Sequence, residues 1–292
     1  MMSTTARPRR SVLYMPGSNA RALDKGRTLA ADALILDLED AVSPEAKTDA
    51  RDQVLAAVAA GGYGHREVAI RVNGLDTPWG HADLAAVAGS GADAAVLPKV
   101  ESADAVRRAD AVLRAAGAPE DLAIWCMIET PRGVLHAEEI ADAHPRLAVL
   151  VMGTSDLAKD LHCAHTQMRL PLLHSLSRCL LAARAAGLAI VDGVHLDLND
   201  EAGFRRACED GLALGFDGKT LIHPKTIATA NEVFAPDADT VAWSRRVIEA
   251  HEAAARRGEG VVLLDGKLIE NLHVEDAHRI VALAEAIERR GE

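Results

Sequence analysis

The feature that most constrains this 292-residue chain is a regular alternation of short apolar runs with longer, alanine-rich segments. The runs lie at 11–17, 33–42, 67–73, 94–100, 122–130, 147–156, 189–196 and 215–222. Runs that are apolar without strict alternation are typical of strands buried on both faces, and strands that alternate with helices form parallel sheets. The pattern therefore predicts an α/β protein built on a parallel sheet.

The number of strand and helix units favours a closed barrel over an open sheet. Eight units are the complement of a (β/α)8 TIM barrel, whereas a doubly wound sheet usually has fewer strands and needs a topological switch point. We therefore predict a barrel over residues 1–235 and a C-terminal helical extension over residues 236–292. The extension is short for a core of its own, so we expect it to pack on the barrel or on a neighbouring subunit.

Charge and cysteine content exclude several classes of function. The chain has 32 basic and 43 acidic residues and a net charge of -11, which argues against a surface for nucleic acid or for anionic membranes. Its 4 cysteines form no CxxC pair, so neither a disulfide framework nor a structural zinc site is expected. No run is long enough to span a membrane. We expect a cytoplasmic protein with a small-molecule substrate.

Polar side chains follow several of the predicted strands. In a barrel of this kind the carboxyl ends of all strands meet on one face, where catalytic groups collect. The polar residues at these ends are Asp37, Glu39, Asp40, Arg71, Asn73, Lys99, Glu129, Asp156 and Asp192. Carboxylates beside a guanidinium indicate a site for Mg2+ with a clamp for a substrate anion.

Glu129 and Asp156 are the best candidates for metal ligands, because each closes a strongly apolar run on neighbouring predicted strands. The alternative is that they cap the helices that follow, and spacing alone does not decide between the two. The backbone amides of Gly153, Thr154 and Ser155 are candidates for holding a substrate carboxylate.

Arg71 is the candidate anion clamp. A guanidinium binds a carboxylate through two parallel hydrogen bonds and stabilises a developing oxyanion. The alternative is an ion pair at the strand end with Glu39 or Asp40, and the two interpretations are compatible. We expect Glu39 and Asp40 to bind metal-bound water or to orient Arg71 rather than to ligate the metal.

Motifs along nearly the whole chain resemble one family. They are RSVLYMPGSN at 10–19, LILDLEDAV at 34–42, IRVNGLDT at 70–77, LPKVES at 97–102, MIETPRG at 127–133, MGTSDLAKDL at 152–161, GFDGKTLIHPKTI at 215–227 and DGKLIENLHVEDA at 265–277. In this order and spacing they resemble the citrate lyase beta-subunit-like family, which includes malyl-CoA and citramalyl-CoA lyases within the HpcH/HpaI aldolase superfamily.

The resemblance implies roles for individual residues. Glu129 and Asp156 would bind Mg2+, and Arg71 would contact the metal-bound oxygen and the carboxylate of the substrate. The residues implied along the coenzyme A path are Tyr14, Lys25, Ile222, His223 and Pro224. The family fold is a TIM barrel whose C-terminal extension, in several members, closes the active site of a neighbouring subunit, which implies a homotrimer or homohexamer.

One position departs from the family pattern. The lyases of this family carry an aspartate in the C-terminal motif, where this chain has Glu270. The resemblance implies that this carboxylate is the catalytic acid that delivers a proton to the acetyl group. Glutamate keeps the charge but reaches one methylene further, so the same role requires a shifted backbone.

The function expected from these residues is a Mg2+-dependent carbon-carbon lyase. It would cleave a malyl-CoA or citramalyl-CoA type substrate into a 2-oxo acid and acetyl-CoA or a related acyl-CoA. The alternatives are a thioesterase or a coenzyme A-independent aldolase on the same site, or a catalytically silent subunit that binds the ligand. Arg71 would stabilise the developing charge, with Glu39 and Asp40 supporting it.

Overall fold

The computed structural model describes residues 7–256, 258 and 261–290. The chain divides into two compact units, one of Arg9–Glu232 and one of Val233–Glu292 with the segment that ends at Pro8. The first unit is a barrel, and the second is built of helices and one hairpin.

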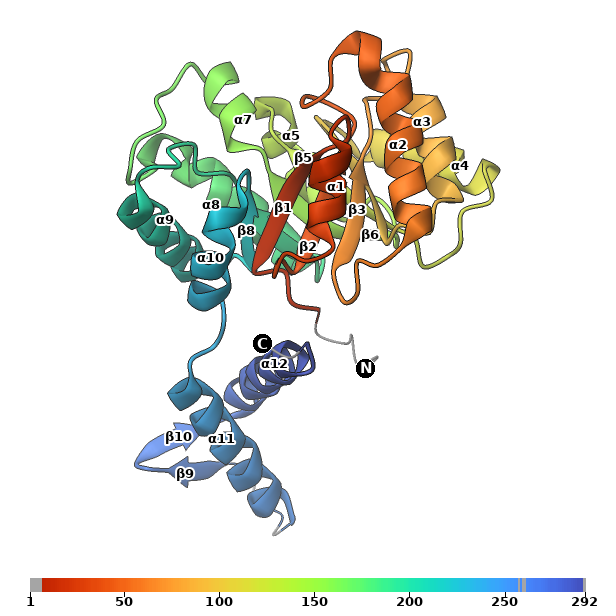
Figure 1. Cartoon of the computed structure of the whole chain (residues 1–292). Helices are drawn as coiled ribbons and strands as arrows, with labels where there is room; N and C mark the ends of the chain where they lie inside the picture. Colours follow the sequence, from red (N-terminus) through yellow and green to blue (C-terminus); the bar gives the residue numbers. More distant parts are fainter. Residues whose placement is uncertain (1–6, 257, 259–260, 291–292) are drawn as a thin grey trace. The chain divides into compact units, whose positions relative to one another are not determined.

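The barrel unit is a closed sheet in which each strand pairs in parallel with the next along the chain and the eighth pairs with the first (Figure 1). Its strands are β1 (Ser11–Pro16), β2 (Ala33–Asp37), β3 (Glu67–Arg71), β4 (Ala94–Leu97), β5 (Ala123–Ile128), β6 (Leu147–Met152), β7 (Ala189–Asp192) and β8 (Gly218–Leu221). The expected (β/α)8 TIM barrel is confirmed.

Helices surround this sheet on its outer side (Figure 1). They are α1 (Ala20–Gly26), α2 (Lys47–Ala60), α3 (Gly80–Ala88), α4 (Ala103–Ala115), α5 (Pro131–Leu135), α6 (Ala137–Ala141), α7 (Thr154–Asp160), α8 (Leu170–Ala185), α9 (Glu201–Leu214) and α10 (Ile227–Val233), with short 3-10 turns η1 (Pro44–Ala46) and η2 (Pro224–Thr226). Buried strands between covering helices explain why the runs are apolar without alternation.

Side chains from β1 to β7 form an apolar cluster inside the barrel. The cluster is dominated by small and β-branched residues such as Val12, Ile35 and Val96, and Trp125 is its largest fully buried side chain. Branched side chains of this size are what the interior of an eight-stranded barrel accommodates. The barrel is therefore a packed core, and chemistry is confined to its rims.

The strands end earlier than the apolar runs, so one candidate residue, Asp156, lies in a helix and not at a strand end. At the end of β2 the Asp37 carboxylate accepts the N–H groups of Glu39 and Ala41, so the chain turns away from the sheet there. After β6, helix α7 begins at Thr154. Asp156 was expected at a strand end and instead lies in the first turn of α7, where a carboxylate is favoured by the helix dipole.

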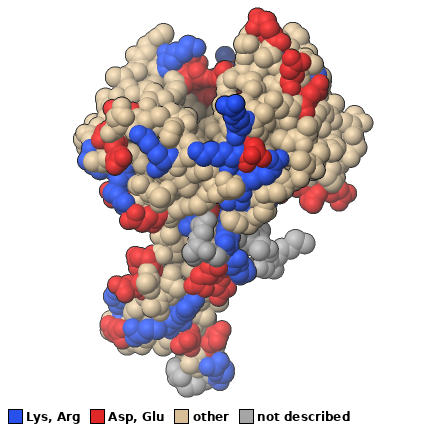
Figure 2. All heavy atoms as spheres, in the orientation of Figure 1, with Lys and Arg blue, Asp and Glu red and all other residues tan. Residues whose placement is uncertain are grey.

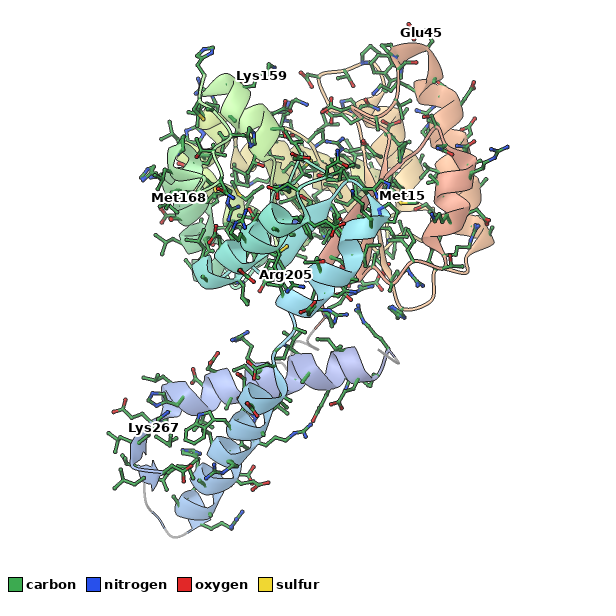
Figure 3. All side chains as sticks on the ribbon, turned by 60° about the vertical axis from the view of Figure 1, so that its left-hand side comes forward. Met15, Glu45, Lys159, Met168, Arg205 and Lys267 are labelled. Carbon is green, nitrogen blue, oxygen red and sulfur yellow. The ribbon has the colours of Figure 1, made fainter. Side chains whose placement is uncertain are left out.

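The loops that follow β2 and β6 reach the same end of the barrel. Figure 3 labels Glu45, in the turn before α2, and Lys159, near the end of α7, and both stand at the upper end of the barrel in that view. This end is the carboxyl end of the strands. The segments that carry the candidate residues therefore share one rim.

The second unit consists of α11 (Ala238–Arg256), β9 (Val262–Leu264), β10 (Lys267–Ile269) and α12 (Asn271–Glu288). Asp265 and Gly266, both with positive φ, join the antiparallel strands in a tight hairpin. Val247, Ile269, Val274 and Ala277 form an apolar cluster within this unit. The extension, which we expected to be too short for a core, thus contains a small one.

None of the described helices is long and apolar enough to cross a membrane.

A glycine in β8 tests the packing of the barrel seam. A Cβ atom at Gly218 would lie 1.9 Å from the carbonyl oxygen of Arg9, a distance that only a backbone shift relieves. Gly218→Ala should lower the free energy of unfolding by about 2 kcal/mol. Gly89→Ala is the matched control, because a Cβ there meets nothing within 4 Å, and its effect should stay within about 0.5 kcal/mol. Urea unfolding measures both, and equal stabilities would contradict this packing.

Candidate active site

The carboxyl rim of the barrel holds a cavity of about 410 Å3. Its lining brings together candidates from distant parts of the sequence, namely Tyr14, Asp40, Arg71, Glu129, Gly153, Thr154, Ser155, Asp156 and Ile222. Glu39 lines a second, larger cavity of about 880 Å3 between the loops after β2, β3 and β4, and Asp40 lines both. The two cavities therefore meet at Asp40.

Arg71 is the most heavily bonded group of the site. Its Nε donates to Oδ1 of Asp37 at 2.7 Å, and its Nη2 donates to Oδ2 of the same carboxylate at 2.6 Å. Nη1 lies 2.8 Å from Oε2 of Glu39 and 3.9 Å from Oδ2 of Asp40. Burial opposes the charge on Arg71, but the bonds with Asp37 outweigh it and hold the pKa of the guanidinium above its ordinary value.

The main partner of Arg71 is therefore Asp37, and not the expected pair Glu39 and Asp40. Asp37 and Arg71 end adjacent parallel strands and are paired in register. Their side chains thus leave the sheet side by side, which the sequence pattern alone did not specify. The sequence feature that could have predicted this pair is that Asp37 and Arg71 are the last residues of neighbouring strands.

Glu129 follows β5 directly and is 2% exposed. Its Oε1 accepts the backbone N–H of Lys99 at 2.8 Å, and no ion pair with Glu129 occurs among residues 7–256, 258 and 261–290. Burial raises the pKa of Glu129 to about 7, although the Lys99 N–H and the nearby cations favour the charged form. A buried carboxylate of this kind is suited to a cation that the chain itself does not supply.

The helix-capping alternative fails for both candidate ligands. Thr130, not Glu129, caps α5, since its hydroxyl oxygen accepts the N–H of Gly133 at 3.0 Å. Gly153 stands at the N-cap of α7, and no side chain caps that helix. The carboxylates of Glu129 and Asp156 are therefore not used as caps.

The turn at Gly153 is shaped around Glu129. A Cβ at Gly153 would lie 2.4 Å from both Cβ and Oε2 of Glu129, so only glycine leaves room for that carboxylate. The N–H of Gly153 donates to the carbonyl of Ile128 at 3.1 Å and is not available to a substrate, contrary to expectation. Thr154 and Ser155 lie in the first turn of α7, where backbone N–H groups have no partner within the helix.

The donor set fits Mg2+. The part of the chain that the structure describes contains no group of three or more His, Cys, Asp or Glu side chains that could hold a metal ion. Glu129 and Asp156 instead offer two carboxylates on one cavity. Mg2+ usually keeps several waters and binds one or two carboxylates together with oxygens of the substrate. Two carboxylates beside an open cavity match this preference.

Only some of the expected coenzyme A residues meet at the cavity. Tyr14 and Ile222 line it, and the Tyr14 ring lies 5.1 Å from the Arg71 guanidinium. Burial raises the pKa of Tyr14, so its hydroxyl stays protonated. Lys25, His223 and Pro224 are not among the lining residues, and His223 caps the turn η2 by accepting the N–H of Lys225.

Glu270 lies in the second unit. It is the N-cap of α12, where its side chain accepts a backbone N–H and its own N–H donates to Nδ1 of His273 at 3.0 Å. This reciprocal arrangement is a capping box, so the local structure accounts for a carboxylate at this position.

Charge is mixed on one face of the barrel unit. On the face that Figure 2 shows, Lys and Arg side chains are interspersed with Asp and Glu side chains. This differs from the single-sign stripe by which nucleic-acid-binding surfaces are recognised.

Comparisons with known proteins place these features in context. A family model described as HpcH/HpaI aldolase/citrate lyase matches residues 10–224. A (3S)-malyl-CoA thioesterase of Cereibacter sphaeroides is 51% identical over 98% of both chains. The citrate lyase subunit beta of Escherichia coli is 39% identical over 96% of this chain and 94% of its own. A crystal structure of protein CitE from Mycobacterium tuberculosis in complex with magnesium, acetoacetate and coenzyme A superposes with a TM-score of 0.74 at 29% identity, over 96% of this chain and 98% of that one.

The raised pKa of Glu129 predicts how stability depends on pH without metal. A carboxyl with a higher pKa in the folded state stabilises the fold at low pH, and this contribution is lost as pH rises from about 4.5 through about 7. In EDTA the wild type should therefore lose about 2 to 3 kcal/mol more than Glu129→Gln between about pH 5 and about pH 8. Urea unfolding at both pH values measures the difference. The same loss in both proteins would contradict the burial of an uncompensated carboxyl.

Proposed function

Because the chain belongs to the HpcH/HpaI aldolase/citrate lyase family, we propose that it is a Mg2+-dependent thioesterase that hydrolyses a malyl-CoA type substrate. The family resemblance seen in the sequence is confirmed, and the chain is an enzyme. The observation that carries the proposal is the similarity, at half of all positions and over the whole length, to a (3S)-malyl-CoA thioesterase.

The prediction of a carbon-carbon lyase, made from the sequence, was wrong. Four relatives that are 50–51% identical over 98% of this chain are named (3S)-malyl-CoA thioesterase, whereas the citrate lyase subunit beta is 39% identical. The expectation failed because relatives with different named activities match nearly the whole chain, a thioesterase at 51% identity and a malyl-CoA lyase at 36%. The family resemblance therefore does not specify which bond of the substrate breaks.

Glu129 and Asp156 would hold the metal ion at the cavity that they line. Mg2+ bound there supplies Lewis acidity to substrate oxygens and fixes their position. Glu129 is suited to this because its Oε1 is already oriented by the Lys99 N–H. Gly153 leaves the space in which that carboxylate stands.

Arg71 would bind the substrate carboxylate or stabilise charge on the thioester oxygen. The Asp37 carboxylate fixes two of its nitrogens, so the guanidinium is oriented before substrate arrives. A charge held in place in this way stabilises an oxyanion without reorganising when the oxyanion forms. Glu39, which pairs with Nη1, completes this support.

Hydrolysis requires a base that removes a proton from the attacking water, and coenzyme A departs as a thiolate. Water adds to the thioester carbonyl carbon, the carbon-sulfur bond breaks, and the proton from water ends on the coenzyme A thiol. We assign the base to Asp40, whose side chain is 61% exposed and lines the cavity. Glu39 is less suited to this role, since Arg71 at 2.8 Å and the hydrogen-bonded Lys99 ammonium occupy its two oxygens. The same two cations lie farther from Asp40, at 3.9 and 3.7 Å.

Glu270 has no equivalent role in hydrolysis. The expected proton delivery belongs to an enolate, and hydrolysis of a thioester forms none. The coenzyme A contacts of Lys25, His223 and Pro224 stay predictions. So do the homotrimer or homohexamer and the closing of a neighbouring site by residues 236–292.

Product analysis tests the proposed activity. With malyl-CoA and Mg2+, the full chain should release free coenzyme A, measured with a thiol reagent, in step with the intact hydroxy acid. Glyoxylate, measured as its hydrazone, should stay at background. EDTA should remove the activity, because it withdraws the Mg2+ ion that Glu129 and Asp156 would hold for the substrate.

Glu129→Gln, prepared in parallel, is the control for thioesterases carried over from the host, and its rate should fall by about a hundredfold or more. Release of glyoxylate and acetyl-CoA in equal amounts, without free coenzyme A, would contradict hydrolysis.

A further inference from the structure

Lys99 has a backbone conformation that its residue type disfavours. Its φ is 48°, in the left-handed region that is uncommon for residues other than glycine. It lies two residues after the end of β4, at the rim that carries the site. Strained backbone at such a rim is frequently part of the function, so the contacts of Lys99 are informative.

Those contacts reach both proposed metal ligands. The Lys99 backbone N–H donates to Oε1 of Glu129 at 2.8 Å, and the Lys99 Nζ lies 3.5 Å from Oδ2 of Asp156. The same ammonium hydrogen-bonds Glu39 and lies 3.7 Å from Asp40. One residue thus touches the two ligands from opposite ends, with its backbone on one and its side chain on the other.

The Lys99 ammonium lies within 4 Å of three carboxylates, those of Glu39, Asp40 and Asp156. Burial opposes its charge, but the hydrogen bond that Lys99 donates to Glu39 and the surrounding carboxylates outweigh burial and keep the Lys99 pKa above its ordinary value. The side chain is nevertheless 45% exposed and lines the larger cavity, which gives the ammonium room to move. It is therefore a charged group on a flexible stem beside the proposed metal position.

We propose that Lys99 is a tethered counterion that competes with the divalent cation for Asp156. Without metal, its ammonium balances the repulsion among Glu39, Asp40 and Asp156. When the cation binds, the ammonium leaves Asp156 and keeps its bond to Glu39, while the backbone N–H continues to orient Glu129. The inference rests on the proposed binding of Mg2+ by Glu129 and Asp156, and Lys99 is a positioning residue that sets metal affinity.

Mn2+ binding to the substrate-free chain, followed by the paramagnetic resonance signal of free Mn2+, tests this without reference to activity. Mn2+ shares the preference of Mg2+ for oxygen ligands. Lys99→Met should bind Mn2+ about tenfold more tightly than the wild type at low salt, because a positive charge beside the ion is removed. The gain should shrink at high salt, as expected for a half-exposed charge.

Three variants complete the series. Lys99→Gly removes the same charge and suits the left-handed backbone, so it should match Lys99→Met even if that variant is destabilised. Lys99→Arg keeps the charge and should stay close to the wild type. Lys159→Met is the matched control, since it removes a charge from α7, where Lys159 is exposed and its Nζ lies 4.0 Å from Asp160 (Figure 3). Its affinity should change by less than about twofold.

The outcomes separate this inference from the proposed function. If Lys99→Met and Lys99→Gly bind Mn2+ as the wild type does, or more weakly, Lys99 is only a structural brace and the inference fails. If the wild type binds Mn2+ and Glu129→Gln does not, the metal site stands in either case. If neither the wild type nor any Lys99 variant binds Mn2+, both the inference and the proposed metal dependence are overturned.

Discussion

The site depends on one buried ion pair, in which the Asp37 carboxylate grips the Arg71 guanidinium with two hydrogen bonds. The remaining contacts extend from it. Arg71 also pairs with Glu39, Glu39 binds the Lys99 ammonium, and the Lys99 backbone orients Glu129. Removing one partner of a buried ion pair leaves an uncompensated charge and is strongly destabilising. We therefore expect loss of Asp37 or Arg71 to disturb the positions of Glu39, Lys99 and Glu129 as well.

This network leaves negative charge in excess. It contains five carboxylates, Asp37, Glu39, Asp40, Glu129 and Asp156, and two cations that pair with them, Arg71 and Lys99. The buried Lys47 ammonium, which donates to the backbone carbonyl oxygens of Leu38 and Glu39, adds a third positive charge nearby and still leaves the carboxylates in excess. A divalent cation would reduce this imbalance, and we propose that it binds beside Glu129, a carboxylate to which the described residues 7–256, 258 and 261–290 offer no ion pair. Because this excess of negative charge disfavours an anionic substrate unless a metal ion mediates the contact, we expect affinity for the metal and affinity for the substrate to be linked.

Much of this was predictable because a barrel brings the ends of its strands to one rim. Apolar runs identified the strands, and the polar residues that end them identified Arg71 and Glu129. Asp156 was selected because it ends an apolar run, although it lies in the first turn of α7. The pairing of Asp37 with Arg71 depends on strand register, and the contacts of Lys99 depend on a left-handed backbone, neither of which periodicity reveals. The prediction of the reaction was wrong because relatives named thioesterase and relatives named lyase both match nearly the whole chain, so the family resemblance does not specify which bond breaks.

We propose that Glu129 and Asp156 hold the metal ion beside Arg71. The decisive experiment is a crystal structure with Mg2+ and a thioether analogue of malyl-CoA, which cannot be hydrolysed. We expect an ion bound by both carboxylates, with Arg71 on an oxygen of the malyl group and the Lys99 ammonium withdrawn from Asp156. An ion bound elsewhere, or a malyl group seated away from Arg71, would contradict it.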